Sequence, residues 1–264
     1  MNDQDAYTVD LLNQDLLGEH DAILYYLTHA WTVARQYGPE ILEIAYDEMR
    51  HFKWLAHTVA ELGGVPDLKT PEVAPITTTQ AALQKDVEAE IHAIDQYREH
   101  IELIAQPAVK SLLQRIVVDE RDHLRQFKEF LDKTHGEPRG VQRPQPEIAQ
   151  VADQLQGSIH MEYQQMMAYL LRSFLDDHGR EMGMDMEERS IDEMRHMGWI
   201  GKKMGQFGIQ PQFPQVNANE DISPGEAEEQ ALYRDIRQWA IDAMPSMVPT
   251  LDRILAQEQY HLNG

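Results

Sequence analysis

Hydrophobic residues recur along the chain at helical spacing, and no stretch alternates convincingly in the manner of a strand. In the first half this pattern predicts four amphipathic helices. They cover about 9–36, 39–62, from the Thr77–Thr79 run to about 105, and 107–134. Gly38-Pro39 and Gly63-Gly64 interrupt the periodicity and predict helix ends, and Pro107 suits the first turn of a helix.

The second half repeats this order of segments. Its predicted helices are about 147–177, 187–207, one that opens at Ser223-Pro224, and a last one whose start lies between Pro245 and Pro249. In each half a proline-containing passage separates the second and third helices, whereas the other turns are short. Two short turns around one long crossover are the wiring of a four-helix bundle with a single overhand connection. The sequence therefore predicts an all-α protein of two four-helix bundles.

The boundary between the halves is a segment rich in proline and glycine and poor in apolar residues, from His135 to Glu147. We predict one domain over 1–136, a linker over 137–146 and a second domain over 147–264. Each half has roughly the size of an ordinary single domain.

A five-residue string occurs twice, letter for letter. Asp47–His51 and Asp192–His196 both read Asp-Glu-Met-Arg-His, and a tryptophan follows each histidine by three residues (Trp54 and Trp199). Such an identity is improbable by chance, and it indicates two copies of one unit.

The repeated string contains Glu-x-x-His, which places a carboxylate and an imidazole on one face of a helix, as a buried metal requires. This pair recurs on the second and fourth predicted helices of both halves. The pairs are Glu48 with His51, Glu120 with His123, Glu193 with His196, and Glu258 with His261.

The first and third helices of each half each offer one glutamate inside the hydrophobic stripe. Glu19 and Glu90 each lead an apolar row, whereas Glu88 leads a solvated face. In the second half the corresponding residues are Glu162 and Glu229. Four buried carboxylates without compensating charge would cost many kcal/mol, and two divalent ions per cluster would compensate them. We therefore expect a di-metal site in each half.

Composition narrows the chemistry further. The chain has no cysteine, which excludes disulfides, iron–sulfur ligation and thiolate zinc sites, and carboxylate with imidazole suits iron, manganese or zinc. The net charge of −22 disfavours nucleic acid and anionic membranes as partners. No apolar run approaches the roughly 18 residues of a membrane span, and the N-terminus lacks the features of a signal peptide. We expect a cytoplasmic protein.

The stretch Tyr46–Leu55, with Glu61–Leu68 after it, resembles bacterioferritin and its rubrerythrin-type relatives in the ferritin-like superfamily. The resemblance covers nearly the whole chain, twice, and implies two tandem ferritin-like bundles. It implies that the glutamate of each Glu-x-x-His bridges two metal ions, namely Glu48, Glu120, Glu193 and Glu258. It implies as terminal ligands Glu19, Glu90, Glu162, Glu229, His51, His123, His196 and His261.

The same resemblance draws attention to other positions. Family members carry a tyrosine near the metals, seven residues after the first ligand, and Tyr26 and Tyr169 match it, with core packing as the equal alternative. In bacterioferritin a methionine that follows the bridging glutamate ligates a haem between two subunits. Met49 and Met194 hold this position, so one chain could supply both thioethers across an internal dimer of its bundles. Packing at a helix contact is the alternative for both methionines.

The expected activity is that of a di-iron carboxylate oxidoreductase, which oxidises Fe(II) with dioxygen or hydrogen peroxide. Ligand type does not separate iron from manganese, so a dimanganese catalase-like activity is one alternative. A non-enzymatic scaffold, whose metals only brace the bundles, is another.

Residues next to the predicted ligands carry further expectations. The aspartates that precede a bridging glutamate (Asp47, Asp119 and Asp192) are expected to orient an imidazole. Gln257 breaks this pattern, so the last pair is expected to be tuned differently. The remaining histidines, His100 among them, are expected at the surface or at helix caps.

Overall fold

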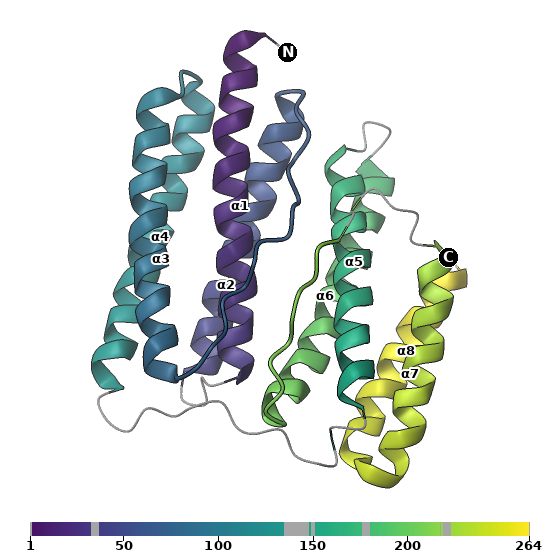
Figure 1. Ribbon diagram of the computed structural model, residues 1–264. Coiled ribbons are helices and arrows are strands. Elements are labelled where there is room, and N and C mark those ends of the chain that lie inside the picture. Colours follow the sequence, from purple (N-terminus) through teal and green to yellow (C-terminus); the bar gives the residue numbers. More distant parts are fainter. Residues whose placement is uncertain are drawn as a thin grey trace. The chain divides into compact units, whose positions relative to one another are not determined.

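The computed structural model describes residues 2–32, 37–134, 148, 151–175, 180–216, 218 and 223–263. Within these residues the chain forms eight α-helices and one 3-10 helix and no strand, which confirms the predicted all-α class (Figure 1). The α-helices are α1 (Asp3–Thr32), α2 (Gly38–Glu61), α3 (Thr79–Leu103), α4 (Pro107–Lys133), α5 (Ala152–Leu175), α6 (Arg180–Gln206), α7 (Ser223–Ala243) and α8 (Val248–Asn263). The 3-10 helix η1 is Pro245–Met247.

The chain divides into two compact units, 1–141 and 142–264. The linker expected over 137–146 lies outside the described residues. In each unit the helices form two hairpins. Helix α1 packs on α2 and α3 on α4, with further contacts of α1 with α3 and α2 with α4; helices α5 to α8 pair in the same way. Each unit is thus a four-helix bundle.

A long crossover joins α2 to α3 and runs back along the first unit (Figure 1). It starts where Gly63 takes a positive φ of 81° and its N–H donates to Ala60 O, which ends α2. Leu68, Thr70 and Ile76 are buried and hold this segment against the helices. At its end the Thr78 side chain accepts a hydrogen bond from Ala81 N at 3.1 Å, so Thr78 is the N-cap of α3.

Two helices begin earlier than the hydrophobic pattern predicts. Helix α1 begins at Asp3 rather than near 9, because Asn2 Oδ1 accepts hydrogen bonds from the N–H groups of Gln4 and Asp5. Asp3 and Asp5 also favour the positive end of the helix dipole. Helix α6 begins at Arg180 rather than near 187. The first turn of α1 is polar and carries no apolar periodicity, so the pattern misses it.

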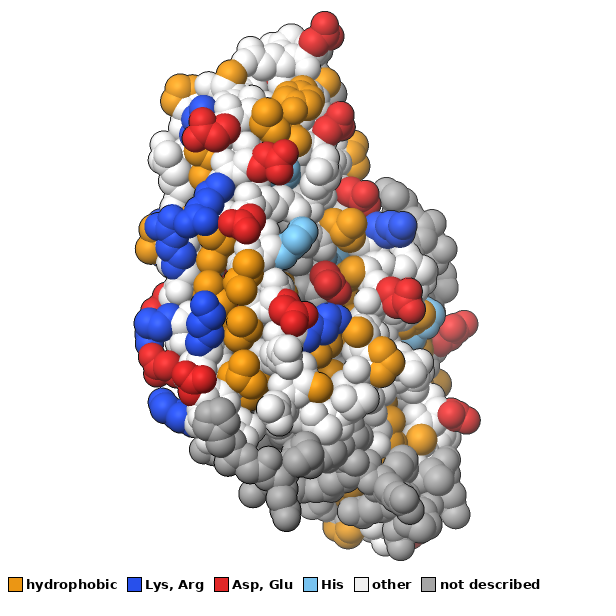
Figure 2. Space-filling model, turned by 60° about the vertical axis from the view of Figure 1, so that its left-hand side comes forward, with side chains coloured by type: hydrophobic (Ala, Val, Ile, Leu, Met, Phe, Trp, Pro, Cys, Tyr) orange, Lys and Arg blue, Asp and Glu red, His pale blue; other side chains and the backbone are white. Residues whose placement is uncertain are grey.

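The bundle cores surround the predicted ligands with apolar side chains. Leu12 and Leu16 precede Glu19 on α1 with no exposed surface, and each such burial contributes about 1.5–3 kcal/mol. On the face shown in Figure 2, hydrophobic side chains gather in a stripe among mixed acidic and basic ones. No helix among the described residues is long and apolar enough to cross a membrane.

Candidate metal centres

All four helices of the first unit contribute carboxylate or imidazole side chains to one buried cluster. Its residues are Glu19 of α1, Glu48 and His51 of α2, Glu90 of α3, and Glu120 and His123 of α4, each at most 4% exposed. Ligand atoms of Glu19, Glu48, His51 and Glu120 lie within 4.8 Å of one another. Ligand atoms of Glu48, Glu90, Glu120 and His123 form a second such group. Glu48 and Glu120 belong to both groups, so the two positions share two carboxylates.

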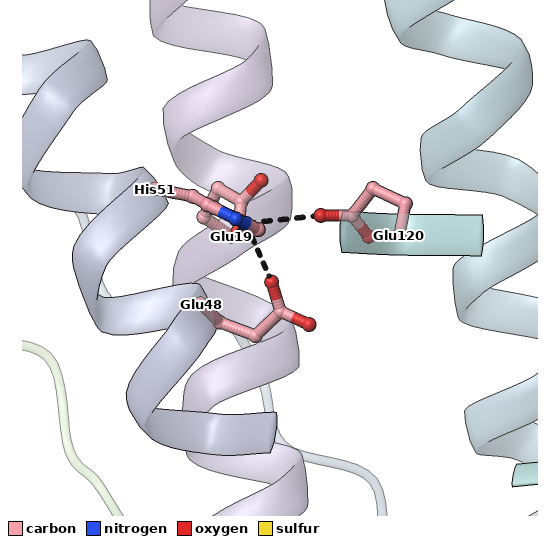
Figure 3. Close-up of side chains that lie close together, drawn as sticks. All are labelled: Glu19, Glu48, His51 and Glu120. Atoms are coloured by element: carbon pink, nitrogen blue, oxygen red, sulfur yellow. Dashed lines mark hydrogen bonds and ion pairs between the residues drawn. The ribbon is translucent and has the colours of Figure 1, made fainter. Parts of the chain in front are cut away.

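The Nδ1 atoms of both histidines face the shared carboxylates, as Figure 3 shows for His51. His51 Nδ1 lies 3.0 Å from Glu48 Oε2 and 3.0 Å from Glu120 Oε1. His123 Nδ1 lies 3.0 Å from Glu48 Oε1. The two oxygens of Glu48 are therefore directed at two different imidazoles, as a carboxylate that bridges two ions would be.

Several inward-facing atoms of this cluster are buried and form no hydrogen bond of good geometry, although some lie within ion-pair distance of an imidazole. They are Glu19 Oε2, Glu48 Oε1, Glu90 Oε2, Glu120 Oε1 and His123 Nδ1. Buried polar atoms in proteins are almost always satisfied, and unsatisfied ones indicate an absent water or ion. The atoms left over here are the ones that a pair of cations would take.

The pKa values show the same need for positive charge. Burial raises the pKa of Glu19 and of Glu90 well above the ordinary value, and the charges of Glu48 and Glu120 raise both further. Although burial opposes ionisation of Glu48, the imidazoles of His123 and His51 lower its pKa. Burial lowers the pKa of His123, but Glu48 outweighs this and raises it to about 9. Without bound cations, the negative charge of the buried carboxylates is compensated only when groups of the cluster bind protons.

The outer nitrogens of the two histidines face aspartates of the opposite helix. His51 Nε2 lies 3.3 Å from Asp119 Oδ2, and His123 Nε2 lies 3.4 Å from Asp47 Oδ2. Each aspartate directly precedes a glutamate of the cluster, which is the arrangement expected for Asp47 and Asp119. The tryptophan of the repeated string packs on the histidine ring, with centroids 5.8 Å apart for His51 and Trp54.

Two tyrosines hold the outer glutamates of the first unit. Tyr26 of α1 donates a hydrogen bond to Glu90 Oε1 of α3 at 2.6 Å, and Tyr97 of α3 donates to Glu19 Oε1 of α1. Burial raises the pKa of both phenols, and the nearby carboxylates raise it further. Both phenols therefore act as hydrogen-bond donors. Tyr97 stands in the apolar row that Glu90 leads, and the sequence pattern did not indicate this bond.

Two buried Asp–His pairs extend this network along α1 and α3. His29 Nδ1 lies 2.7 Å from Asp86 Oδ2, and His100 Nδ1 lies 2.8 Å from Asp15 Oδ1. Gln96 Nε2 also donates to Asp15 Oδ1 at 2.9 Å. Burial raises the pKa of both aspartates, and the imidazoles oppose that rise. The expectation that the remaining histidines lie at the surface or at caps is wrong for His20, His29 and His100, which are at most 4% exposed.

A repeated spacing underlies this arrangement and could have revealed it. Helices α1 and α3 share the order Asp-x3-Glu-x6-Tyr-x2-His, as Asp15, Glu19, Tyr26, His29 and as Asp86, Glu90, Tyr97, His100. The two helices run antiparallel (Figure 1), so a residue further along one meets a residue further back on the other. The tyrosine of each helix thus reaches the glutamate of its partner.

The second unit brings its predicted ligands into a similar buried cluster. They are Glu162 of α5, Glu193 and His196 of α6, Glu229 of α7, and Glu258 and His261 of α8. Ligand atoms of Glu162, Glu193, His196 and Glu258 lie within 4.8 Å of one another. His196 Nδ1 lies 2.9 Å from Glu258 Oε1, and His261 Nδ1 lies 3.3 Å from Glu193 Oε1. Glu229 has no exposed surface and accepts a hydrogen bond from Gln165 Nε2.

The surroundings of the second cluster differ from those of the first. Tyr233, four residues after Glu229, donates a hydrogen bond to Glu162 Oε1. Tyr169 is 2% exposed, and the Arg189 guanidinium lies 5.9 Å from the centre of its ring. His196 Nε2 faces Gln257 Oε1 at 3.3 Å. An amide therefore occupies the place that Asp119 holds in the first unit.

Met49 and Met194 directly follow Glu48 and Glu193 and are half-buried. The haem that they were expected to ligate, and the internal dimer of the two bundles, stay predictions.

A known protein family matches the first unit of the chain. Residues 9–136 match the ferritin-like domain family. Among solved structures, the chain is similar to the bacterioferritin of Desulfovibrio desulfuricans, whose diiron site was determined in different catalytic states. The identity is 23%, the match covers 51% of this chain and 85% of that chain, and the TM-score is 0.48. No curated protein matches the chain.

Proposed function

We propose, on the premise that residues 9–136 form a ferritin-like domain, that the chain is a di-iron carboxylate oxidoreductase of the ferritin-like superfamily. It oxidises Fe(II) with dioxygen or hydrogen peroxide, and each unit holds one di-metal centre. We also infer that the two units are copies of one bundle, which the repeated Asp-Glu-Met-Arg-His string and the equivalent helix pairing support.

One observation carries the proposal: two ligand groups that share Glu48 and Glu120, with inward atoms left unsatisfied. Four carboxylates and two imidazoles per unit would hold two cations, and two divalent ions balance four carboxylates. Bound iron supplies this charge compensation and one electron per ion to the oxidant.

Apolar packing around the cluster keeps bulk water away from it. Every predicted ligand of the first unit is at most 4% exposed. In such a site the fixed carboxylates act on a cation more strongly than they would in water. The hydrogen bonds from Tyr26 and Tyr97 hold the outer glutamates in one orientation.

Reduction of an oxidant consumes protons, and the first unit has groups that can hold them. His29 Nδ1 lies 2.7 Å from an oxygen of Asp86, and His100 Nδ1 lies 2.8 Å from an oxygen of Asp15. Both lie within about a turn of a tyrosine that contacts a predicted ligand. We propose that these pairs supply protons toward the centre.

The test is Fe(II) oxidation by protein loaded anaerobically and then mixed with oxygen or peroxide. We expect the protein to oxidise Fe(II) faster than buffer does, and Glu90→Gln to remove the contribution of the first unit. Glu88→Gln is the matched control, because Glu88 lies on the same helix outside the cluster and is more accessible to solvent. Equal rates for wild type and buffer would contradict the oxidoreductase and leave metals that only brace the bundles.

The metal itself is identified by elemental analysis of protein purified without added metal. Iron would support the proposed activity, whereas manganese with steady release of oxygen from peroxide would favour the catalase-like alternative. A haem at Met49 and Met194 would give a Soret band that is lost in the Met49→Leu, Met194→Leu double variant.

A further inference from the structure

We propose that the two centres differ in affinity: the second unit holds its metal ions more weakly than the first, and Gln257 and Gln165 cause the difference. The inference rests on the proposed metal binding and ranks two sites whose ligand types are the same. It follows from the groups that contact the ligands rather than from the ligands themselves.

In the first unit an aspartate carboxylate faces the Nε2 atom of each imidazole. Asp119 Oδ2 lies 3.3 Å from His51 Nε2, and Asp47 Oδ2 lies 3.4 Å from His123 Nε2. An imidazole that binds a cation through Nδ1 carries its proton on Nε2. A carboxylate that accepts this proton in a hydrogen bond makes the ring a stronger electron donor and fixes its orientation.

In the second unit Gln257 replaces one of these carboxylates by a neutral amide. Its Oε1 lies 3.3 Å from His196 Nε2, and its Nε2 donates to Asp192 Oδ1 at 3.2 Å. The remaining aspartate is therefore shared. Asp192 lies 3.6 Å from His261 Nε2, beyond hydrogen-bond distance, whereas its ion pair with Arg195 has a counterpart in the pair of Arg50 with Asp47. Both imidazoles of this unit lose part of the support that their counterparts have.

The arginine one turn before each of these two positions, 119 and 257, has a different partner in the two units. Arg115 forms an ion pair with Asp119 on α4. Arg253 stands four residues before Gln257, as Arg115 stands before Asp119. Its guanidinium lies 4.5 Å from the centre of the Trp199 ring. Position 257 therefore offers Arg253 an amide where position 119 offers Arg115 a carboxylate.

A second amide competes for a predicted ligand. Gln165 Nε2 donates a hydrogen bond to Glu229 Oε2, and both side chains are buried. The equivalent position on α1, three residues after the first glutamate, is Ala22, which has no donor to offer. Glu90 belongs to a compact ligand group, whereas within the described residues the group found in the second unit does not include Glu229. The amide thus occupies one oxygen of Glu229 and leaves Oε1 to a cation, so a cation that takes both oxygens must displace the amide.

These differences act in one direction. Outer hydrogen-bond partners of this kind change metal affinity by about 10–100-fold, so we expect the dissociation constants of the two centres to differ by about that factor. The centre near Glu48 and Glu120 fills first, and the centre near Glu193 and Glu258 releases its ions first to a chelator.

The experiment titrates Co(II) into the full-length protein in competition with a chelator. Each measurement uses a variant in which one substitution removes one of the two centres. Glu258→Ala reports on the first centre, and Glu120→Ala reports on the second. Gln257→Glu and Gln165→Ala are added to the Glu120→Ala background, where we expect tighter binding. Asp119→Asn in the Glu258→Ala background is expected to weaken binding by about 10–100-fold.

Two control variants make the same charge changes at exposed positions of the same helices. Gln259→Glu on α8 matches Gln257→Glu, and Asp132→Asn on α4 matches Asp119→Asn. Each control is made in the background of the variant that it matches. A long-range effect of charge alone would appear in the controls as well.

The outcomes separate this inference from the proposed function. Tighter binding in the first centre, with shifts in the three variants and none in the controls, supports the ranking. Equal constants that the substitutions do not move, or a tighter second centre, would overturn the ranking while leaving metal binding intact. Proteins that keep their helical circular dichroism but bind no Co(II) in either background would overturn the proposed function and this inference with it.

Discussion

The two units carry the same types of predicted ligand in the same helix order, yet they differ in the side chains that contact those ligands from outside the cluster. In the first unit each element of the network occurs twice, because α1 and α3 carry the same spacing and α2 and α4 carry the same Asp-Glu-x-x-His string. In the second unit the positions equivalent to Asp15 and Asp86 are Ser158 and Gly225. Those equivalent to His29 and His100 are Arg172 and Trp239.

This comparison shows which parts of a carboxylate cluster are separable. The predicted ligands are present in both units. Among the described residues, the Asp–His pairs, the exchange of hydrogen bonds by Tyr26 and Tyr97, and the second aspartate beside an imidazole occur in the first unit only. Ser158 Oγ, for example, donates to carbonyl oxygens of its own helix, where Asp15 pairs with a histidine of another. A donor set can therefore persist while the groups that tune it change.

The largest expected effect comes from removing one bridging carboxylate in each unit. Glu120→Ala should abolish metal binding by the first unit and spare the second, and Glu258→Ala should do the reverse, because each glutamate lies in its own cluster. Elemental analysis after anaerobic loading with Fe(II) measures the remaining metal, with Glu88→Ala as the control. If either substitution emptied both units, the two centres would not be independent.

The next effect concerns the Asp–His pairs, which distinguish the units. His29→Leu leaves Asp86 buried without its partner, so we expect the free energy of unfolding of the first unit to fall by about 3–5 kcal/mol. Ser158→Ala in the second unit should cost no more than about 1.5 kcal/mol, since it removes only a hydrogen bond within one helix. Urea unfolding followed by circular dichroism measures both. Equal losses would mean that the pair contributes nothing beyond packing.

A smaller effect is the response of the chelated protein to pH. Glu48 raises the pKa of His123 from an ordinary 6.5 to about 9, so the folded first unit binds a proton more tightly than the unfolded chain. That stability, about 3 kcal/mol, is fully present below pH 6.5 and is lost as the pH rises through about 9. We therefore expect the thermal midpoint of metal-free protein to decrease as the pH rises from 6.5 to about 9.

Metal should reverse this trend, because cations displace protons from carboxylates and imidazoles and bind better as the pH rises. Thermal scans with Co(II) and with excess chelator, at pH 6.5 and pH 9, compare the two states. A chelated protein as stable at the higher pH as at the lower one would contradict the proton-holding cluster.

Much of the candidate site is readable from the chain, and the missed parts have a common cause. A glutamate four or seven positions before apolar residues lies on the buried face of its own helix, so Glu19 and Glu90 can be selected from one helix at a time. The hydrogen bonds of Tyr97 and Tyr233, and the Asp–His pairs, join two helices. Periodicity within one helix shows which face is buried, but it does not show which residue of another helix a given side chain will contact.

The sequence by itself determined the helical class, the bundle wiring and the chemistry of the ligands, because these depend on local spacing and on residue type. The tertiary structure decided which carboxylates belong to both ligand groups of the first unit and which tyrosine bonds which glutamate. It also decided that an amide donates a hydrogen bond to Glu229. Those relations depend on the register between packed helices. Close packing of the whole core sets that register, and no short segment of sequence contains it.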